Sequence, residues 1–98
     1  MLVKPLRYLD AHALRCALPM NAAIDAIEAV MHAAGSGDAE APVRTMQSVV
    51  RSGKEDFVFV VMPGVWRERQ AAVAKIVSNV PDNPLEGRAT VQGVAVML

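Results

Sequence analysis

Residues 73–93 read VAKIVSNVPDNPLEGRATVQG, and this stretch organises our interpretation of the whole chain. Its first part is an apolar strand that carries one lysine, Lys75. A loop with two prolines and a glycine then reverses the chain, and a second apolar strand carries Thr90 and Gln92. A lysine between valines on one strand face is costly to bury without a partner. We therefore expect the two strands to bring Lys75 and Thr90 together as a small site for an anion or a carbonyl group.

The chain is short and rich in apolar residues. It has 98 residues, enough for one domain spanning 1–98; 53% of them are hydrophobic, and the mean hydropathy is +0.28. A domain of this size buries roughly 60–70% of the surface of its unfolded chain. One small core therefore does not hide all the apolar surface, and we expect a homodimer or a higher oligomer.

Charge and cysteine content argue against several classes of protein. Ten basic residues balance ten acidic ones without a basic stripe, which argues against nucleic-acid binding. Cys16 is the only cysteine, so no internal disulfide forms, as is typical of a reducing cytoplasm. No apolar run approaches the ~18 residues of a membrane span, and the N-terminus lacks a signal-peptide core. We expect a cytoplasmic protein that does not contact a membrane.

Hydrophobic periodicity predicts helices first and strands afterwards. A helix over 11–18 begins at Asp10 as its cap and stops at Pro19, and a second helix over 20–34 has Asn21 as its cap and ends at Gly35-Ser36-Gly37. Strands are predicted over 6–9 (at a sheet edge), 43–51, 57–62, 71–78 and 89–97, with a break at Pro63-Gly64. The predicted fold class is α+β: N-terminal helices packed on a mixed, mainly antiparallel sheet that dimerises through the sheet.

Histidines give no convincing metal site. His32 shares the polar side of the second predicted helix with Asp25 and Glu28, where a solvated surface is the simpler interpretation. We expect no metal. The chain also ends on the apolar run 94–98 without a polar tail, so it looks cut from something longer or adapted to hide that end.

Six short motifs occur in one order along almost the whole chain. The motifs are Leu18-Pro19-Met20, Pro42-Val43-Arg44, Met62-Pro63-Gly64, Lys75-Ile76-Val77, Pro81-Asp82-Asn83-Pro84 with Gly87, and Thr90-Val91-Gln92-Gly93. Together they resemble the N-terminal half of the ornithine cyclodeaminase and mu-crystallin family, which includes ketimine reductases and archaeal-type alanine dehydrogenases.

The resemblance implies a fold and a set of site residues. In the family this half is the substrate-binding and dimerisation domain, and a Rossmann domain that binds NAD(H) or NADP(H) follows it. By match to the family's motifs, Arg44 would hold the substrate carboxylate, Met62 would line the pocket and Thr90 would complete the anion site. Lys75 would contact the carboxylate or carbonyl region and assist the chemistry, provided that a Rossmann partner is present.

One departure from the family bears directly on function. No G-x-G-x-x-G follows a strand in this chain, so we expect no cofactor on it, and the family reaction needs the missing domain. Three hypotheses follow. The chain is a dimeric module that binds a small amino, imino or keto acid without catalysis; or it is a subunit that works with a separate Rossmann-domain chain; or it is a structural or interaction protein without a ligand.

Arg44 and Lys75 also have a simpler interpretation, which the residues alone leave open. An arginine fork matches a carboxylate, and a desolvated lysine beside it polarises a carbonyl group. Alternatively, both charges lie solvated at strand ends, or they pair with Glu55, Glu86 or Asp82.

Overall fold

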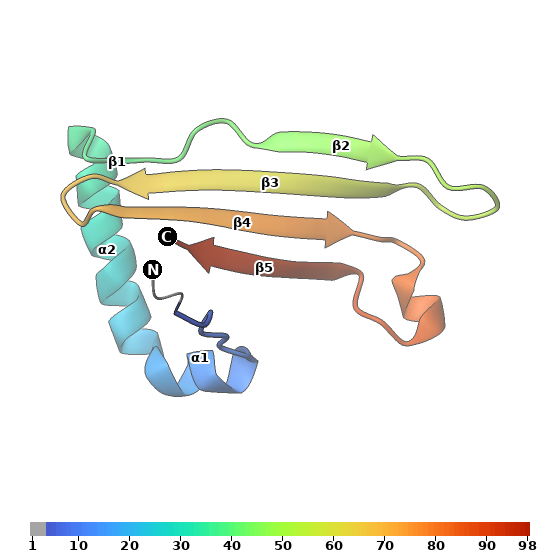
Figure 1. Ribbon diagram of the computed structural model, residues 1–98, viewed down its shortest axis with the longest axis horizontal. Helices are drawn as coiled ribbons and strands as arrows, with labels where there is room; N and C mark the ends of the chain where they lie inside the picture. The colour runs from blue at the N-terminus through green and yellow to red at the C-terminus, as the bar shows by residue number, and fades with distance from the viewer. Residues whose placement is uncertain (1–3) are drawn as a thin grey trace.

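A computed structural model describes residues 4–98, in which both helices precede all the strands (Figure 1). The elements are α1 (Ala11–Ala17), α2 (Met20–Ser36), β1 (Ala39–Glu40), β2 (Thr45–Val49), β3 (Phe57–Trp66), β4 (Ala71–Asn79), the 3₁₀ helix η1 (Asn83–Glu86) and β5 (Val91–Met97). All pairings among these strands are antiparallel. The α+β class is therefore confirmed. Within the described range, no helix is both long enough and apolar enough to cross a membrane.

β3 is the central strand of the sheet. It pairs with β4 along one side over nine residue pairs, and β5 pairs with the far side of β4. Its other side pairs with β2 near its start and with β1 at its end. The predicted break at Pro63-Gly64 is wrong, because β3 runs through both residues. Pro63 is tolerated there because it lies where residues 41–44 leave that side of β3 unpaired.

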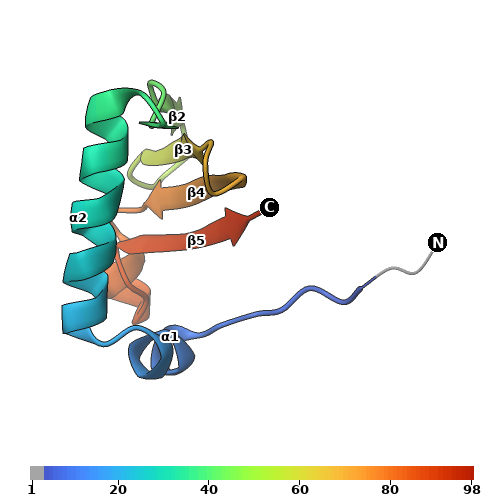
Figure 2. The same ribbon diagram turned by 90° about the vertical axis from the view of Figure 1, so that its left-hand side faces the viewer.

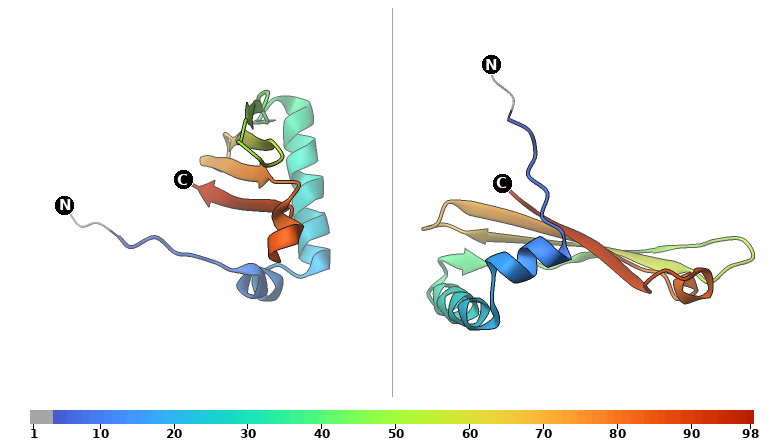
Figure 3. Two further views of the ribbon diagram at one scale, coloured as in Figure 1. Left: turned by 90° about the vertical axis from the view of Figure 1, so that its right-hand side faces the viewer. Right: turned by 90° about the horizontal axis from the view of Figure 1, so that it is seen from below.

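The helices begin and end much as the sequence predicts. The Asp10 side chain accepts a hydrogen bond from the Ala13 amide (2.8 Å) and caps α1. Gly37 ends α2 in the left-handed conformation with φ 82°, which glycine adopts without strain. Pro19, not Asn21, is the cap residue of α2. The predicted edge strand over 6–9 is also wrong: this segment is unpaired and extends away from the sheet (Figures 2 and 3).

Packing between the elements is thin. Ala39 and Val60 are the only buried apolar residues within 4–98. The accessible surface is 8280 Å², whereas a compact monomer of 10.5 kDa exposes about 5,400 Å². The radius of gyration is 16.7 Å, against about 13 Å for a compact chain of this length. The extended segment before α1 contributes to both excesses. This chain alone therefore builds very little core.

α2 crosses one end of the sheet at a steep angle to the strands (Figures 1 and 2). It contacts the sheet mainly through small side chains, since its half-buried residues are Ala22, Ala23, Ala29, Val30 and Ala33. The larger apolar stripe that the periodicity identifies is exposed instead: Ile24, Ile27 and Met31 retain 59%, 62% and 66% of their accessible surface. The amphipathic pattern therefore predicted the helix but not which side the sheet covers.

Polar contacts join loops at the two ends of the sheet. At the α2 end, the Trp66 indole donates to the Asp38 carboxylate (2.9 Å), and Arg67 pairs with Glu40 (2.8 Å). At the far end, Arg51 pairs with Asp82 (2.6 Å) and donates to a backbone carbonyl of its own loop. The Arg51–Asp82 pair thus joins the β2–β3 loop to the segment between β4 and β5.

Asn83 anchors that second segment from inside. It is the one buried polar residue among 4–98, and its amide donates to the Ala89 carbonyl (2.9 Å). We expect Asn83→Ala to lower the free energy of unfolding by about 1–2 kcal/mol, because the carbonyl loses its partner. Asn79→Ala, at an exposed position, should change it by less than about 0.5 kcal/mol in the same urea titration. Equal effects of the two variants would contradict an anchoring role.

The Arg51–Asp82 pair predicts a pH dependence. The hydrogen bond from Arg51 is the largest cause that lowers the pKa of Asp82 below its usual value. A lowered pKa contributes stability above the ordinary pKa of the group, and this contribution is lost as the pH falls through the lower folded pKa. Between about pH 5 and pH 2, the wild type should therefore lose more stability than Arg51→Ala.

Urea unfolding at stepped pH measures this difference. Arg69→Ala, which removes a guanidinium stacked on Trp66 instead, serves as the matched control and should follow the wild type. Parallel curves for the wild type and Arg51→Ala would contradict the assignment.

Candidate functional site

The strand register divides the sheet into two faces. Because side chains alternate along a strand and paired residues share a side, the register assigns every strand residue to one face. We call one of them the helix-side face, since α2 lies over its end; it carries Met46, Ser48, Val58, Val60, Met62, Gly64, Trp66, Ala71, Val73, Lys75, Val77, Asn79, Val91, Gly93, Ala95 and Met97. Lys75 is its only charged residue within these paired strands.

Lys75 lies beside a hollow on this face. It pairs with Met62 on β3 and with Ala95 on β5, so both of these side chains flank it. The hollow has a volume of about 370 Å³ and is lined by Met62, Lys75, Val77, Val91, Gly93, Val94 and Ala95. Apart from the lysine, every lining residue is apolar. An ammonium group at the edge of such a hollow suits the charged end of a small, largely apolar molecule.

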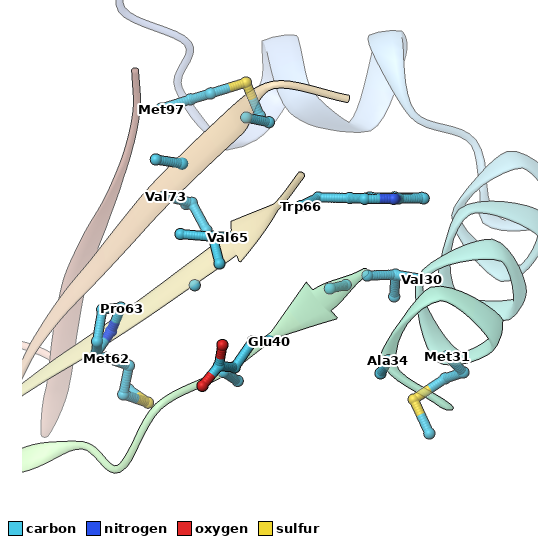
Figure 4. Close-up of a pocket in the computed structure, with 15 residues that line it drawn as sticks. Val30, Met31, Ala34, Glu40, Met62, Pro63, Val65, Trp66, Val73 and Met97 are labelled. Carbon is cyan, nitrogen blue, oxygen red and sulfur yellow. The ribbon is translucent and has the colours of Figure 1, made fainter. Parts of the chain in front are cut away.

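A second hollow adjoins the first along β3. It has a volume of about 430 Å³ and lies between α2 and the sheet, with Met62 shared by both hollows. Figure 4 shows the Trp66 ring directed toward α2, with Val30 beside it and Met31 on the helical wall. Together the two hollows form a groove from α2 across the helix-side face toward β5, and its lining is apolar apart from Glu40 and Lys75.

The position of Arg44 relative to Lys75 follows from the start of β2. Arg44 precedes β2 by one residue, and Thr45, the first residue of β2, pairs with Val61. The paired register ends there, so Arg44 lies one residue beyond it, while Met62 is the next residue of β3 and pairs with Lys75. The structure pairs Met62 with Lys75 directly and places Arg44 just outside the paired strands.

Thr90 is not part of this group. Lys75 pairs with Ala95, five residues after Thr90 in the chain. The Thr90 carbonyl instead accepts a hydrogen bond from the Val80 amide (2.8 Å), at the other end of β4. Five strand residues span roughly 16 Å. The expectation that Lys75 and Thr90 lie close together within one chain is therefore wrong, because the register sets Thr90 opposite Val80, five residues along the chain from Lys75.

Two of the three acidic residues considered as partners of Arg44 and Lys75 pair with other cations. Asp82 pairs with Arg51, and Glu86 pairs with Lys54 and Arg88, whereas Glu55 contributes only its backbone carbonyl, to Arg51. The pKa of Glu86 is lowered, first by the hydrogen bond from Arg88 and then by that from Lys54. Across residues 4–98, Arg44 and Lys75 take part in no ion pair. Both side chains are exposed and available to a ligand.

Two small residues that line the hollow beside Lys75 were not identified from the sequence. Gly93 and Ala95 lie beside Lys75 on the helix-side face. A Cβ atom added at Gly93 would lie 3.0 Å from the Ile76 carbonyl oxygen and 3.1 Å from Val77, so the backbone is closely approached there. Only the register, which pairs β5 with β4, reveals that these residues border the lysine.

Comparison with known proteins supports the fold. No protein-family model and no curated protein matches the sequence. Δ1-pyrroline-2-carboxylate reductase of Thermococcus litoralis, solved with NADH and L-proline, superposes with a TM-score of 0.76 at 24% identity, over 91% of this chain and 27% of that one. An archaeal alanine dehydrogenase dimer with bound NAD superposes with a TM-score of 0.73 at 21% identity, over 91% and 26%.

The chain thus spans about a quarter of the length of each of these proteins. At this level of identity, the likeness establishes the fold and leaves the activity open. The implied fold is confirmed: this chain has the fold of about a quarter of Δ1-pyrroline-2-carboxylate reductase and of the archaeal alanine dehydrogenase.

Proposed function

We propose that this chain is a dimeric module that binds a small amino, imino or keto acid by its carboxylate and does not catalyse a reaction alone. The observation that carries the proposal is the position of Lys75. It is the one charged residue on the helix-side face of the paired strands, beside an apolar hollow. An unpaired ammonium group adds nothing to the packing of such a face, so a ligand is the better reason for it.

Arg44 supports the same chemistry. It directly precedes β2, and if the β2 register were continued by one residue, β3 alone would separate Arg44 from Lys75, with roughly 10 Å between the two backbones. Both side chains are long enough to meet at one carboxylate between them. The guanidinium would provide a bidentate contact and the ammonium a point charge, and Met62 between them would contact the apolar part of the ligand.

Similarity to solved structures narrows the ligand class. One similar protein was solved with L-proline, a cyclic amino acid, and the other is an alanine dehydrogenase. Both ligand classes combine one carboxylate with a small apolar body. The groove beside Lys75 is matched to such a ligand in polarity, because its lining residues are apolar apart from Lys75 and, in the hollow beside α2, Glu40.

The residues of this chain do not fit a dinucleotide. The dinucleotide cradle of a Rossmann domain needs a glycine-rich turn from a strand into an α-helix. Both α-helices here precede β1, so no strand within 4–98 leads into an α-helix. We therefore assign no cofactor to this chain and derive no hydride transfer from its residues.

A split enzyme is the second candidate. In it, this chain would be one subunit of an NAD(P)-dependent enzyme like ornithine cyclodeaminase or ketimine reductase, with the Rossmann domain on a separate chain. The observation that favours it is the open helix-side face: Lys75 is exposed, and no described element covers the hollow beside it. Lys75 would then assist the chemistry at a site that the second chain closes.

Dimer formation is supported by the exposed surface. The chain exposes about 2,900 Å² more than a compact monomer of its mass, and a standard protein interface buries about 800 Å² per partner. If assembly were the only function, as the third hypothesis holds, the same surface would be buried but no carboxylate would bind.

Calorimetric titration with pyruvate, L-proline, ornithine and cyclic imino acids tests the proposal. We expect saturable binding that Lys75→Ala and Arg44→Ala each weaken at least about tenfold, because each removes a charge-assisted hydrogen bond. Lys54→Ala is the matched control, since Lys54 pairs with Glu86 away from the groove, and it should leave binding unchanged. If the folded oligomer gives no heat with any of these compounds, the carboxylate-binding function is refuted and assembly remains as the only function.

A stability measurement separates a ligand residue from a structural one. Lys75→Met keeps the length of the side chain and removes its charge from an apolar face. We expect the free energy of unfolding to stay within about 0.5 kcal/mol of the wild type or to rise, while carboxylate binding is lost. A loss of more than about 2 kcal/mol in urea unfolding would instead make Lys75 a structural residue.

A further inference from the structure

We infer that the carboxylate site at Lys75 takes an unbranched aliphatic acid of about eight to ten carbons, whose chain lies along the helix-side face and ends in the hollow beside α2. This inference rests on the proposed function for the contact between the carboxylate and Lys75. It names a longer ligand than the small acids considered above. The charges in the two hollows, the distance between them and the residues along the path support it.

The two hollows of the groove differ in charge. Lys75 lines one of them, is exposed and takes part in no ion pair within residues 4–98. Glu40 is the only charged residue among those that line the hollow beside α2, and it pairs with Arg67 (2.8 Å). Arg69, the cation stacked on Trp66, does not line this hollow. The groove therefore attracts a carboxylate at Lys75 and offers a second anion no free cation at the α2 end.

The strand register gives the distance from Lys75 to the far wall of the hollow beside α2. Lys75 pairs with Met62, whereas Ala71, four residues earlier on β4, pairs with Trp66. Four strand residues span roughly 13 Å. An extended hydrocarbon chain advances about 1.3 Å per carbon, because bonds of about 1.5 Å meet at nearly tetrahedral angles. A carboxylate held at Lys75 therefore reaches Trp66 with a chain of about ten carbons.

Two residues of β3 keep the path between Lys75 and Trp66 passable. Gly64 lies between Met62 and Trp66 on the helix-side face and pairs with Val73. A Cβ atom added at Gly64 would lie only 3.2 Å from the Val73 side chain, so any larger residue there would narrow the passage. Met62, which lines both hollows, has a flexible thioether side chain that adapts to an apolar ligand.

The hollow beside α2 suits the apolar end of such a chain. Val30, Met31 and Ala34 of α2 form one wall, and the Trp66 ring is directed toward this helix (Figure 4). Its volume of about 430 Å³ is within the range of pockets that bind drug-sized molecules. A small acid held at Lys75 does not extend roughly 13 Å, so it would leave this hollow empty. A longer aliphatic acid would fill both hollows at once.

Calorimetric titration with a series of saturated acids, from butanoate to dodecanoate and below their micelle concentrations, tests the length of the site. We expect the affinity to rise about fourfold with each added carbon as far as decanoate, because each one buries a further methylene group. Dodecanoate should bind no more than about twofold tighter than decanoate, whereas unlimited hydrophobic binding would give about sixteenfold. Either that continued rise or a decanoate no tighter than butanoate would overturn the inference.

Trp66 reports whether the chain reaches the hollow beside α2. It is the only tryptophan in the sequence, so the intrinsic fluorescence of the protein comes chiefly from this hollow. Decanoate should shift the emission to shorter wavelength, because its chain displaces water from the indole ring. Saturating butanoate should leave the emission unchanged. Binding of decanoate with no change in Trp66 emission would contradict this placement of the chain.

A pair of leucine variants on α2 tests the same placement. Ala34→Leu fills part of the hollow from its helical wall and should weaken decanoate binding at least about tenfold. The affinity of this variant for butanoate shows whether the Lys75 end is intact. Ala26→Leu, at an exposed position of the same helix outside the lining of the hollow, is the matched control and should bind decanoate like the wild type. Equal affinities of the two variants would count against the inference.

The charged end is tested with decanamide, which has the same chain and no charge. It should bind at least about tenfold more weakly than decanoate, and Lys75→Ala should weaken decanoate binding to a similar extent. If decanamide binds as tightly as decanoate, the groove recognises hydrocarbon alone and the inference is overturned.

These outcomes remain distinct from those of the small-acid titration. If pyruvate or L-proline binds through Lys75 but decanoate binds no tighter than butanoate, the proposed function stands and this inference fails. If decanoate binds through Lys75 while no small acid gives heat, the longer ligand stands and the small acids are refuted.

Discussion

The antiparallel pairing of β3 with β4 is the constraint on which the rest of this structure depends. Its nine residue pairs set Lys75 opposite Met62 and fix the turn at 67–70, where Gln70 adopts a positive φ of 50°. β5, β2 and β1 are then aligned from these two strands. A shift of one residue in this register would move Lys75 to the other face of the sheet and separate it from Met62.

The sheet presents apolar side chains on both faces, and this chain covers little of either. α2 covers only one end of the helix-side face, and it does so with alanines, so few large side chains interdigitate. Hydrophobic burial is the main favourable term in folding, and here many large apolar side chains remain exposed. The proposed assembly would therefore add to the stability of the protein, because it would bury the same apolar surfaces.

Polar contacts hold the loops at the two ends of the sheet, where few apolar side chains pack together. Asp38 accepts hydrogen bonds from the Trp66 indole and from the Glu68 amide, and Arg51 reaches both its own loop and Asp82. Exposed ion pairs contribute little free energy each, so their main effect is to position the loops at the two ends of the sheet. The groove that contains Lys75 lies between these two ends, and its lining residues are apolar apart from Lys75 and Glu40.

The sequence by itself determined what depends on neighbours in the chain. Asp10 and Gly37 mark helix ends through local capping, the alternation of valines marks strands, and the order of short motifs identified the fold. Only the tertiary structure decided the register, and with it three features that local patterns miss. β3 continues through Pro63, Thr90 lies far from Lys75, and Gly93 borders the hollow. Pairing between distant segments sets these positions, and no local preference encodes which residue faces which.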